Sequence, residues 1–149
     1  MGMNVQKALA GIESIAIDTA PFIYYIEEHK HYLRAVDQLF TLVDKGSISG
    51  CTSIITLIEV ASKPMEEKNS DLIARYEELL SDSKNFTMYD IDRRIALESA
   101  RLRAVYSLKT PDAIQIATGL VNGAQAFITN DRPLKKIKGI KVILLDDLM

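Results

Sequence analysis

Short apolar runs alternate along this chain with longer segments whose apolar residues recur every three or four positions. The short runs have the length of strands, and the longer segments have the period of amphipathic helices. Strands are predicted at residues 14–17, 47–51, 86–91, 126–128 and 142–145. Helices are predicted from residue 19 onward, over 32–45, 52–62, 69–80 and 92–106, and from 110 to Gly123. This alternation predicts an α/β fold, with a central parallel sheet of about four to five strands covered by helices on both faces.

The length and composition of the chain indicate one domain. Its 149 residues are 48% hydrophobic, which is ample for a single core. We expect residues 14–149 to form this domain and residues 1–13 to be an N-terminal extension of unknown role, with a helical turn at residues 5–9. No apolar run approaches the length of a membrane span, and the single cysteine, Cys51, suits a reducing compartment. A cytoplasmic protein without membrane association is the expectation.

Two acids bracket the most apolar part of the chain, which runs from Leu108 to Asp131. Thr110 can cap a helix there, Pro111 suits the first helical position, and Asp112 then lies in the first turn. Asp131 comes just after the strand that follows. A helix that leads into a parallel strand runs antiparallel to it, so the helix start and the strand end share one edge of the sheet. If the strand is parallel, Asp112 and Asp131 face the edge where open α/β sheets bind ligands.

Two further acids are candidates for the same edge. Asp18 follows the first predicted strand directly. Glu59 is the only charge in its predicted helix, but it lies roughly two turns, about 10 Å, from the helix start, and reaches the edge only if the helix is tilted. Each acid also has an ordinary structural interpretation. Asp18 and Asp112 suit a helix N-terminus, Asp131 suits a turn, and Glu59 suits a buried Arg or Lys partner.

Four carboxylates at one edge are hard to explain without a cation. Oxygen ligands are preferred by hard divalent ions such as Mg²⁺ and Mn²⁺, which can activate water for phosphoryl displacement. A zinc site is not indicated, because the chain has one cysteine and its two histidines, His29 and His31, are two positions apart on different helix faces. The pattern favours a magnesium or manganese site.

Four motifs in order resemble the PIN domain, and most closely the single-domain ribonuclease toxins of the VapC type. They are the runs Ile15–Thr19, Thr52–Val60, Thr110–Ala117 and Phe127–Asp131. The resemblance covers about residues 14–146. It implies a PIN-like α/β fold, a Mg²⁺- or Mn²⁺-dependent endoribonuclease, a homodimer, and a partner antitoxin that blocks the site.

The resemblance also implies roles for single residues. The four acids match the family's acidic positions, which makes them the expected catalytic and metal-binding residues: Asp18, Glu59, Asp112 and Asp131. Four polar residues are expected to support the acids or to position substrate: Thr19, Thr110, Thr129 and Asn130. Ala20 and Pro21 depart from the family, which often has a small polar residue after Asp-Thr.

An RNA substrate would need local positive charge, because the net charge of the chain is −2. Two basic segments, residues 93–109 and 132–141, can supply phosphate contacts that position RNA without reading its sequence. The candidates are Arg101, Lys109, Arg132, Lys135 and Lys136. A solvated surface without a ligand is the alternative for both segments.

The helices of residues 22–45 carry more aromatic side chains than one core needs, namely Phe22, Tyr24, Tyr25, Tyr32 and Phe40. Some of them are expected at a homodimer or antitoxin interface, unless all of them belong to the core.

Three functions remain open: a ribonuclease toxin, an RNA-processing nuclease without a toxin role, and an inactive PIN-like binding module. The presence of all four acids favours a nuclease.

Overall fold

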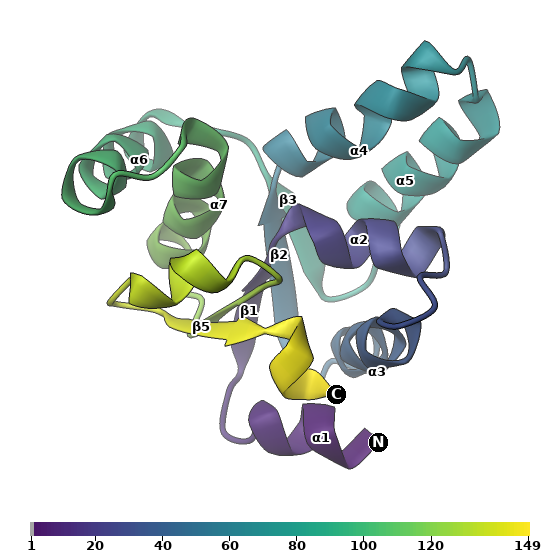
Figure 1. Ribbon diagram of the computed structural model, residues 1–149, viewed down its shortest axis with the longest axis horizontal. Coiled ribbons are helices and arrows are strands. Elements are labelled where there is room, and N and C mark those ends of the chain that lie inside the picture. The colour runs from purple at the N-terminus through teal and green to yellow at the C-terminus, as the bar shows by residue number, and fades with distance from the viewer. Residues whose placement is uncertain (1) are drawn as a thin grey trace.

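The computed structural model describes residues 2–149, and it has the predicted central sheet with helices on both faces (Figure 1). Five strands lie in the order β3-β2-β1-β4-β5, and every neighbouring pair is parallel. The strands are β1 Ser14–Ile17, β2 Ser49–Ser53, β3 Phe86–Tyr89, β4 Ala126–Thr129 and β5 Lys141–Leu144. The assumption of a parallel strand before Asp131 is confirmed.

The helices divide between the two faces of the sheet (Figure 1). Their bounds are α1 Gly2–Ala8, α2 Thr19–Ile26, α3 Leu33–Asp44, α4 Ile55–Glu66, α5 Ser70–Asp82, α6 Arg93–Tyr106 and α7 Thr110–Val121, with 3-10 helices η1 Arg132–Lys136 and η2 Leu145–Leu148. Side chains of α1, α2, α3 and α5 form one core, whereas those of α6, α7 and η1 form the other. Helices α4 and α5 pair as a hairpin that projects beyond the sheet edge (Figure 1).

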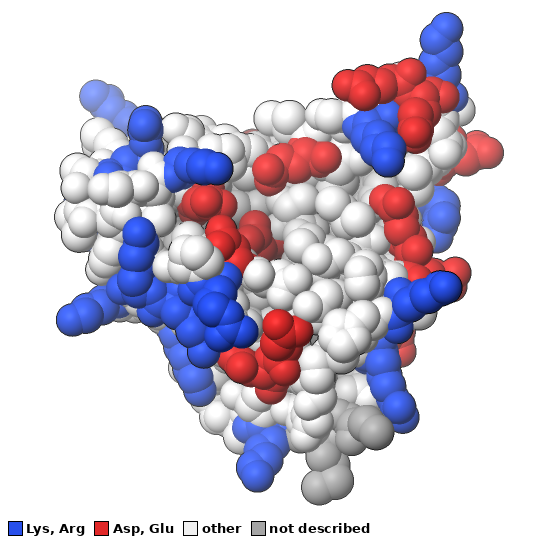
Figure 2. Space-filling model, in the orientation of Figure 1, with Lys and Arg blue, Asp and Glu red and all other residues white. Residues whose placement is uncertain are grey.

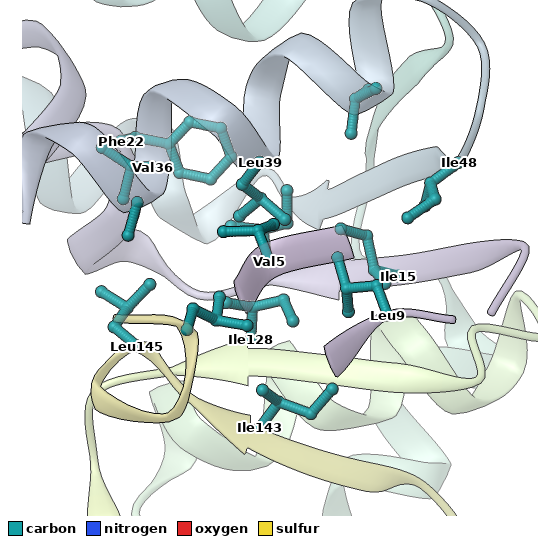
Figure 3. Packing of buried hydrophobic residues seen from close by; sticks show 14 of the residues in the cluster. Val5, Leu9, Ile15, Phe22, Val36, Leu39, Ile48, Ile128, Ile143 and Leu145 are labelled. Atoms are coloured by element: carbon teal, nitrogen blue, oxygen red, sulfur yellow. The ribbon is translucent and has the colours of Figure 1, made fainter. Parts of the chain in front are cut away.

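Successive side chains of the central strands point to opposite faces of the sheet and so contribute to both cores. In β1, Ile15 and Ile17 face the α1–α3 side, and Ala16 between them faces α7. Figure 3 shows Ile15 and Ile128 packed with Val5 and Leu9 from the N-terminal segment. Residues of the predicted extension therefore contribute to the main core, although Met1 lies outside the described residues. The division of the chain at residue 13 stays a prediction.

Gly119 lies where helix α7 packs closely against the sheet. A Cβ atom at this position would be only 2.8 Å from the Cβ of Ala16 in β1, closer than van der Waals contact allows. The small residue therefore lets the helix backbone approach the central strand. Gly123 follows the helix with φ +77°, the left-handed conformation that glycine adopts at a helix end.

The start of α4 differs from the prediction. Strand β2 runs over Ser49–Ser53 rather than residues 47–51, so α4 begins at Ile55 instead of Thr52. Thr52 and Ser53 continue the parallel ladder with β3, although they are polar and buried. The helix also continues through Pro64 to Glu66, two residues beyond the proline.

The N-cap of α5 is Asn69, whose side chain accepts a hydrogen bond from the Leu72 N–H. The cap predicted at Thr110 is wrong. The N-cap position of α7 falls on Lys109 rather than Thr110, and no side-chain hydrogen bond caps this end. Among residues 2–149, no helix is long and apolar enough to cross a bilayer.

Candidate functional site

Asp18 lies where β1 ends and α2 begins, and it is held by hydrogen bonds on both carboxylate oxygens. Oδ1 accepts from the Thr19 N–H at 2.8 Å, the bond of a helix N-cap. Oδ2 accepts from the Thr129 hydroxyl at 2.7 Å, across from the end of β4. The Asp18 N–H in turn donates to the Ile128 carbonyl. The side chain is thus fixed between the two central strands, at their carboxyl ends.

Glu59 reaches the same edge from α4. Because α4 begins at Ile55, Glu59 is its fifth residue and lies only about 6 Å along the axis, not the predicted 10 Å. Its Oε1 accepts a hydrogen bond from the Thr19 hydroxyl at 2.6 Å. The residue is exposed overall, and none of the ion pairs among residues 2–149 includes it. A buried Arg or Lys partner for Glu59 is therefore excluded within this part of the chain.

Asp112, in the first turn of α7, lies close enough to Asp131, just after β4, for the Asp131 charge to act on it. Both are half-buried. Burial raises the pKa of Asp112, the charges of Asp131 and Glu59 raise it further, and Lys109 works in the opposite direction. The Asp131 N–H donates to the Thr129 hydroxyl at 3.1 Å, so one threonine connects Asp131 with Asp18.

The four acids form one electrostatic unit. Burial raises the pKa of Asp18 from 3.8 to about 6; the hydrogen bonds from Thr129 and Thr19 oppose this rise, and the charges of Asp112 and Glu59 add to it. In the described chain, the two ion pairs join Arg101 to Glu98 and Lys135 to Asp147, so no salt bridge neutralises any of the four. Figure 2 shows acidic side chains gathered in the hollow between the α6–α7 lobe and the α4–α5 hairpin.

The donor chemistry of this edge suits a hard cation. Within residues 2–149, no three His, Cys, Asp or Glu side chains form a group that could hold a metal ion as they stand. Mg²⁺, however, usually takes one or two carboxylates and keeps several waters. Four carboxylates without ion-pair partners fit a hydrated Mg²⁺ or Mn²⁺ bound through one or two of them.

A buried polar network beneath Glu59 escaped the sequence analysis. It consists of Thr52, Ser53, Thr56 and Gln115, all at most 2% exposed, and it reaches the site through Thr19. Every buried side-chain nitrogen and oxygen in the described chain has a hydrogen-bond partner. The available signal was a polar residue between apolar neighbours in each helix, Thr56 between Ile55 and Leu57 and Gln115 between Ile114 and Ile116.

The other polar residues expected at the site differ in position. Thr19 and Thr129 each donate to one of the acids. Asn130 instead turns its amide toward the Tyr24 hydroxyl, at 3.2 Å. Thr110 is exposed at the start of α7, and no hydrogen bond ties its side chain to the acids in the described structure.

The five basic residues expected to contact RNA also differ in their surroundings. Arg101 pairs with Glu98, and Lys135 pairs with Asp147, so their charges are partly compensated. Lys109 is the N-cap of α7 and acts electrostatically on Asp112. The remaining two, Arg132 and Lys136, are exposed on η1. Figure 2 shows a group of basic side chains on the η1 side of the acidic hollow.

The aromatic residues of α2 and α3 are mostly packed within the chain. Phe22 is buried against Phe40 and Phe86, with ring centroids 5.3 and 5.6 Å apart. Tyr24 and Tyr32 are half-buried and stack at 4.9 Å. An interface at this surface stays a prediction.

The fold and the acidic edge define an α/β protein with a parallel five-stranded sheet and carboxylates at the carboxyl ends of its strands. Residues 15–140 match the sequence model of the PIN domain, and the chain belongs to this family. No curated protein matches the chain.

Three solved structures with the same fold are of toxin–antitoxin complexes. A chain of a toxin–antitoxin complex from Klebsiella pneumoniae is 26% identical, with a TM-score of 0.68 over 88% of this chain and 97% of that one. A chain of DNA-bound VapBC from Salmonella typhimurium is 20% identical, with a TM-score of 0.69 over 90% and 99%. A chain of VapBC2 from Rickettsia felis, bound to a promoter DNA fragment, is 15% identical, with a TM-score of 0.71 over 88% and 98%.

Proposed function

We propose that this protein is a divalent-metal-dependent endoribonuclease and the VapC-type toxin of a type II toxin–antitoxin pair. The observation that carries the proposal is the set of four carboxylates at the carboxyl edge of the sheet, with no ion-pair partner among the described residues. A cluster of this kind repels itself, and the simplest compensation is a bound cation. Membership of the PIN family supports the same function.

The residues that would hold Mg²⁺ or Mn²⁺ are Asp18, Glu59, Asp112 and Asp131. When bound, the cation supplies an activated water and neutralises charge on the phosphodiester. Thr129 holds the Asp18 carboxylate and Thr19 holds the Glu59 carboxylate, each by a hydrogen bond to one oxygen. The acids therefore do not have to reorganise when RNA binds, which lowers the cost of reaching the transition state.

RNA reaches this negative edge through the basic residues beside it. Arg132 and Lys136 are exposed on η1, directly after Asp131 in the sequence, and neither is in an ion pair of the described chain. Lys109 lies beside Asp112. In this proposal these side chains contact phosphates and set the orientation of the strand without selecting its sequence.

The toxin role rests on the structural neighbours, which are chains of toxin–antitoxin complexes. It includes a cognate antitoxin, a homodimer and a cytoplasmic location. A contact surface for a partner is available near the site, because Ile58 and Met65 on α4 are 62% and 61% exposed and belong to the same helix as Glu59.

Incubation of the purified protein with total RNA tests the proposal. Cleavage is expected with Mg²⁺ or Mn²⁺ and is expected to stop on chelation. The variant D112N should lose activity, whereas the matched control D37N, an exposed acid on α3, should keep it. Undiminished cleavage after exhaustive chelation would rule out the metal mechanism. Expression that arrests growth only without the product of an adjacent gene would separate a toxin from an RNA-processing enzyme.

A further inference from the structure

Gln115 is a fully buried amide in the middle of α7, on the side of the helix that faces β2 and α4. It is 2% exposed and lies among apolar neighbours such as Ile116 and Ala117. Its amide contacts the hydroxyls of Thr19 and Thr56. A buried amide is costly unless its hydrogen bonds are made, and the proposed mechanism assigns this residue no part.

The orientation of the amide follows from its one contact with the backbone. The Ser53 N–H can only donate, and it lies 3.3 Å from Oε1 of Gln115. Oε1 must therefore face Ser53, and the NH₂ group must face the two threonines. Nε2 donates to the Thr56 hydroxyl at 2.7 Å and to the Thr19 hydroxyl at 3.2 Å.

The hydrogen of Thr56 is directed away from the site. The Ile17 carbonyl can only accept, and it receives the Thr52 hydroxyl hydrogen at 2.7 Å. Thr52 then has a lone pair free for Thr56, whose hydroxyl lies at 2.8 Å, much closer than the 3.3 Å from Thr56 to Thr19. Thr56 thus donates to Thr52, and the donor to the Thr19 hydroxyl is the Gln115 amide.

Thr19 is the point where this network meets the site. Its hydroxyl oxygen accepts from Gln115, so its single hydrogen is free for Glu59, whose Oε1 is 2.6 Å away. That bond is the one polar contact that the described chain makes with the Glu59 carboxylate. The direction of a hydroxyl buried beneath the site therefore determines how an exposed carboxylate is held.

We propose that Gln115 is a positioning residue, which fixes the Thr19 hydroxyl as a donor and thereby holds Glu59 toward Asp18 and Asp112. The role of Glu59 in binding metal rests on the proposed function, whereas the hydrogen-bond direction does not. Removal of a residue that orients a metal ligand through a hydrogen bond typically lowers metal affinity or activity by about tenfold to a hundredfold.

A double-mutant cycle with Mn²⁺ alone as the probe tests this role. Q115M keeps roughly the same volume and removes the Nε2 donor to Thr19 and Thr56 together with the Oε1 acceptor of the Ser53 N–H. It should weaken Mn²⁺ binding by about tenfold in the parent and leave the binding of an E59Q protein unchanged. An equal loss in both backgrounds would mean that Gln115 acts through general packing, and it would overturn the proposal.

A matched control separates this effect from lost stability. Thr118 is buried on the same helix, but its hydroxyl donates to the Ile114 carbonyl of that helix and does not reach the site. T118V should lower the free energy of unfolding and leave Mn²⁺ affinity unchanged. A drop in affinity equal to that of Q115M would also overturn the proposal.

Crystal structures of the parent and Q115M distinguish failure of this inference from failure of the proposed function. A parent that neither binds Mn²⁺ nor cleaves RNA would refute the proposed function only. The positioning role still requires that the Glu59 carboxylate leaves Thr19 in Q115M. A Glu59 side chain in the same place in both structures would refute it, whatever the metal does.

Discussion

The substitution D18N should stabilise the protein in the absence of metal, and the gain should depend on pH. Asp18 has a pKa of about 6 in the folded chain, against 3.8 for an ordinary aspartate, chiefly because it is buried. Between these values the folded state binds a proton that the unfolded state does not. The free energy of unfolding of the parent therefore falls as the pH rises from about 4 to about 6, and then stays level.

The size of the effect follows from the shift. Each pKa unit corresponds to 1.36 kcal/mol, so a rise of about two units costs the parent at most about 3 kcal/mol above pH 6. D18N removes the charge and keeps one of the two contacts unchanged. The amide oxygen can accept from the Thr19 N–H, and asparagine is as good an N-cap as aspartate. The amide nitrogen replaces the oxygen that accepts from Thr129, so the Thr129 hydroxyl has to turn and accept instead. The gain in the free energy of unfolding should thus be at most about 3 kcal/mol at pH 7.5 and vanish near pH 4.

Urea denaturation of both proteins with chelator, at intervals from pH 4 to pH 8, measures this difference. A variant no more stable than the parent at pH 7.5, or a gain independent of pH, would refute the reasoning. Saturating Mn²⁺ should make the parent more stable than D18N. A thousandfold excess over the dissociation constant stabilises the parent by about 4.1 kcal/mol, which exceeds the gain of at most about 3 kcal/mol, and the variant lacks one of the proposed ligands.

Three further outcomes are expected. G119A should lower the free energy of unfolding by about 1–3 kcal/mol in urea denaturation, because the new Cβ would lie 2.8 Å from that of Ala16; unchanged stability would contradict the tight packing of α7. T129V removes a hydrogen bond that lowers the pKa of Asp18, so carboxyl NMR should show that pKa rising, and a fall would contradict the assignment. D112N should leave stability without metal unchanged or raise it by about 1 kcal/mol, and should reduce the shift in melting temperature caused by millimolar Mn²⁺. Equal shifts in both proteins would mean that Asp112 is not a ligand.

The acidic edge could be predicted because it depends on chain order. Asp18 and Asp131 follow strands, and Asp112 begins a helix, so a parallel sheet brings them to one edge whatever the packing details. Glu59 stood out as the one charge in an apolar segment. Only its distance from the helix start was wrong, because β2 extends through Thr52 and Ser53.

The support beneath the acids could not be predicted, because it depends on contacts between distant segments. Thr52 is tolerated inside a buried strand since its hydroxyl donates to the Ile17 carbonyl of the next strand. Thr56 and Gln115 are 59 positions apart in the sequence and meet only after α7 packs on β1. Local patterns identify such residues as polar exceptions, but the partner of each appears only in three dimensions.

The central claim is that the four acids hold the divalent cation that RNA cleavage requires. Its most direct test is a single Mn²⁺ titration of metal-free protein, in which occupancy is followed by electron paramagnetic resonance and cleavage of a labelled RNA is followed in the same samples. The two curves should rise together and reach a plateau at the same Mn²⁺ concentration in the parent, and both should move to much higher Mn²⁺ in D112N. Cleavage at full rate before any Mn²⁺ is bound, or a bound ion that leaves the RNA intact, would contradict the account.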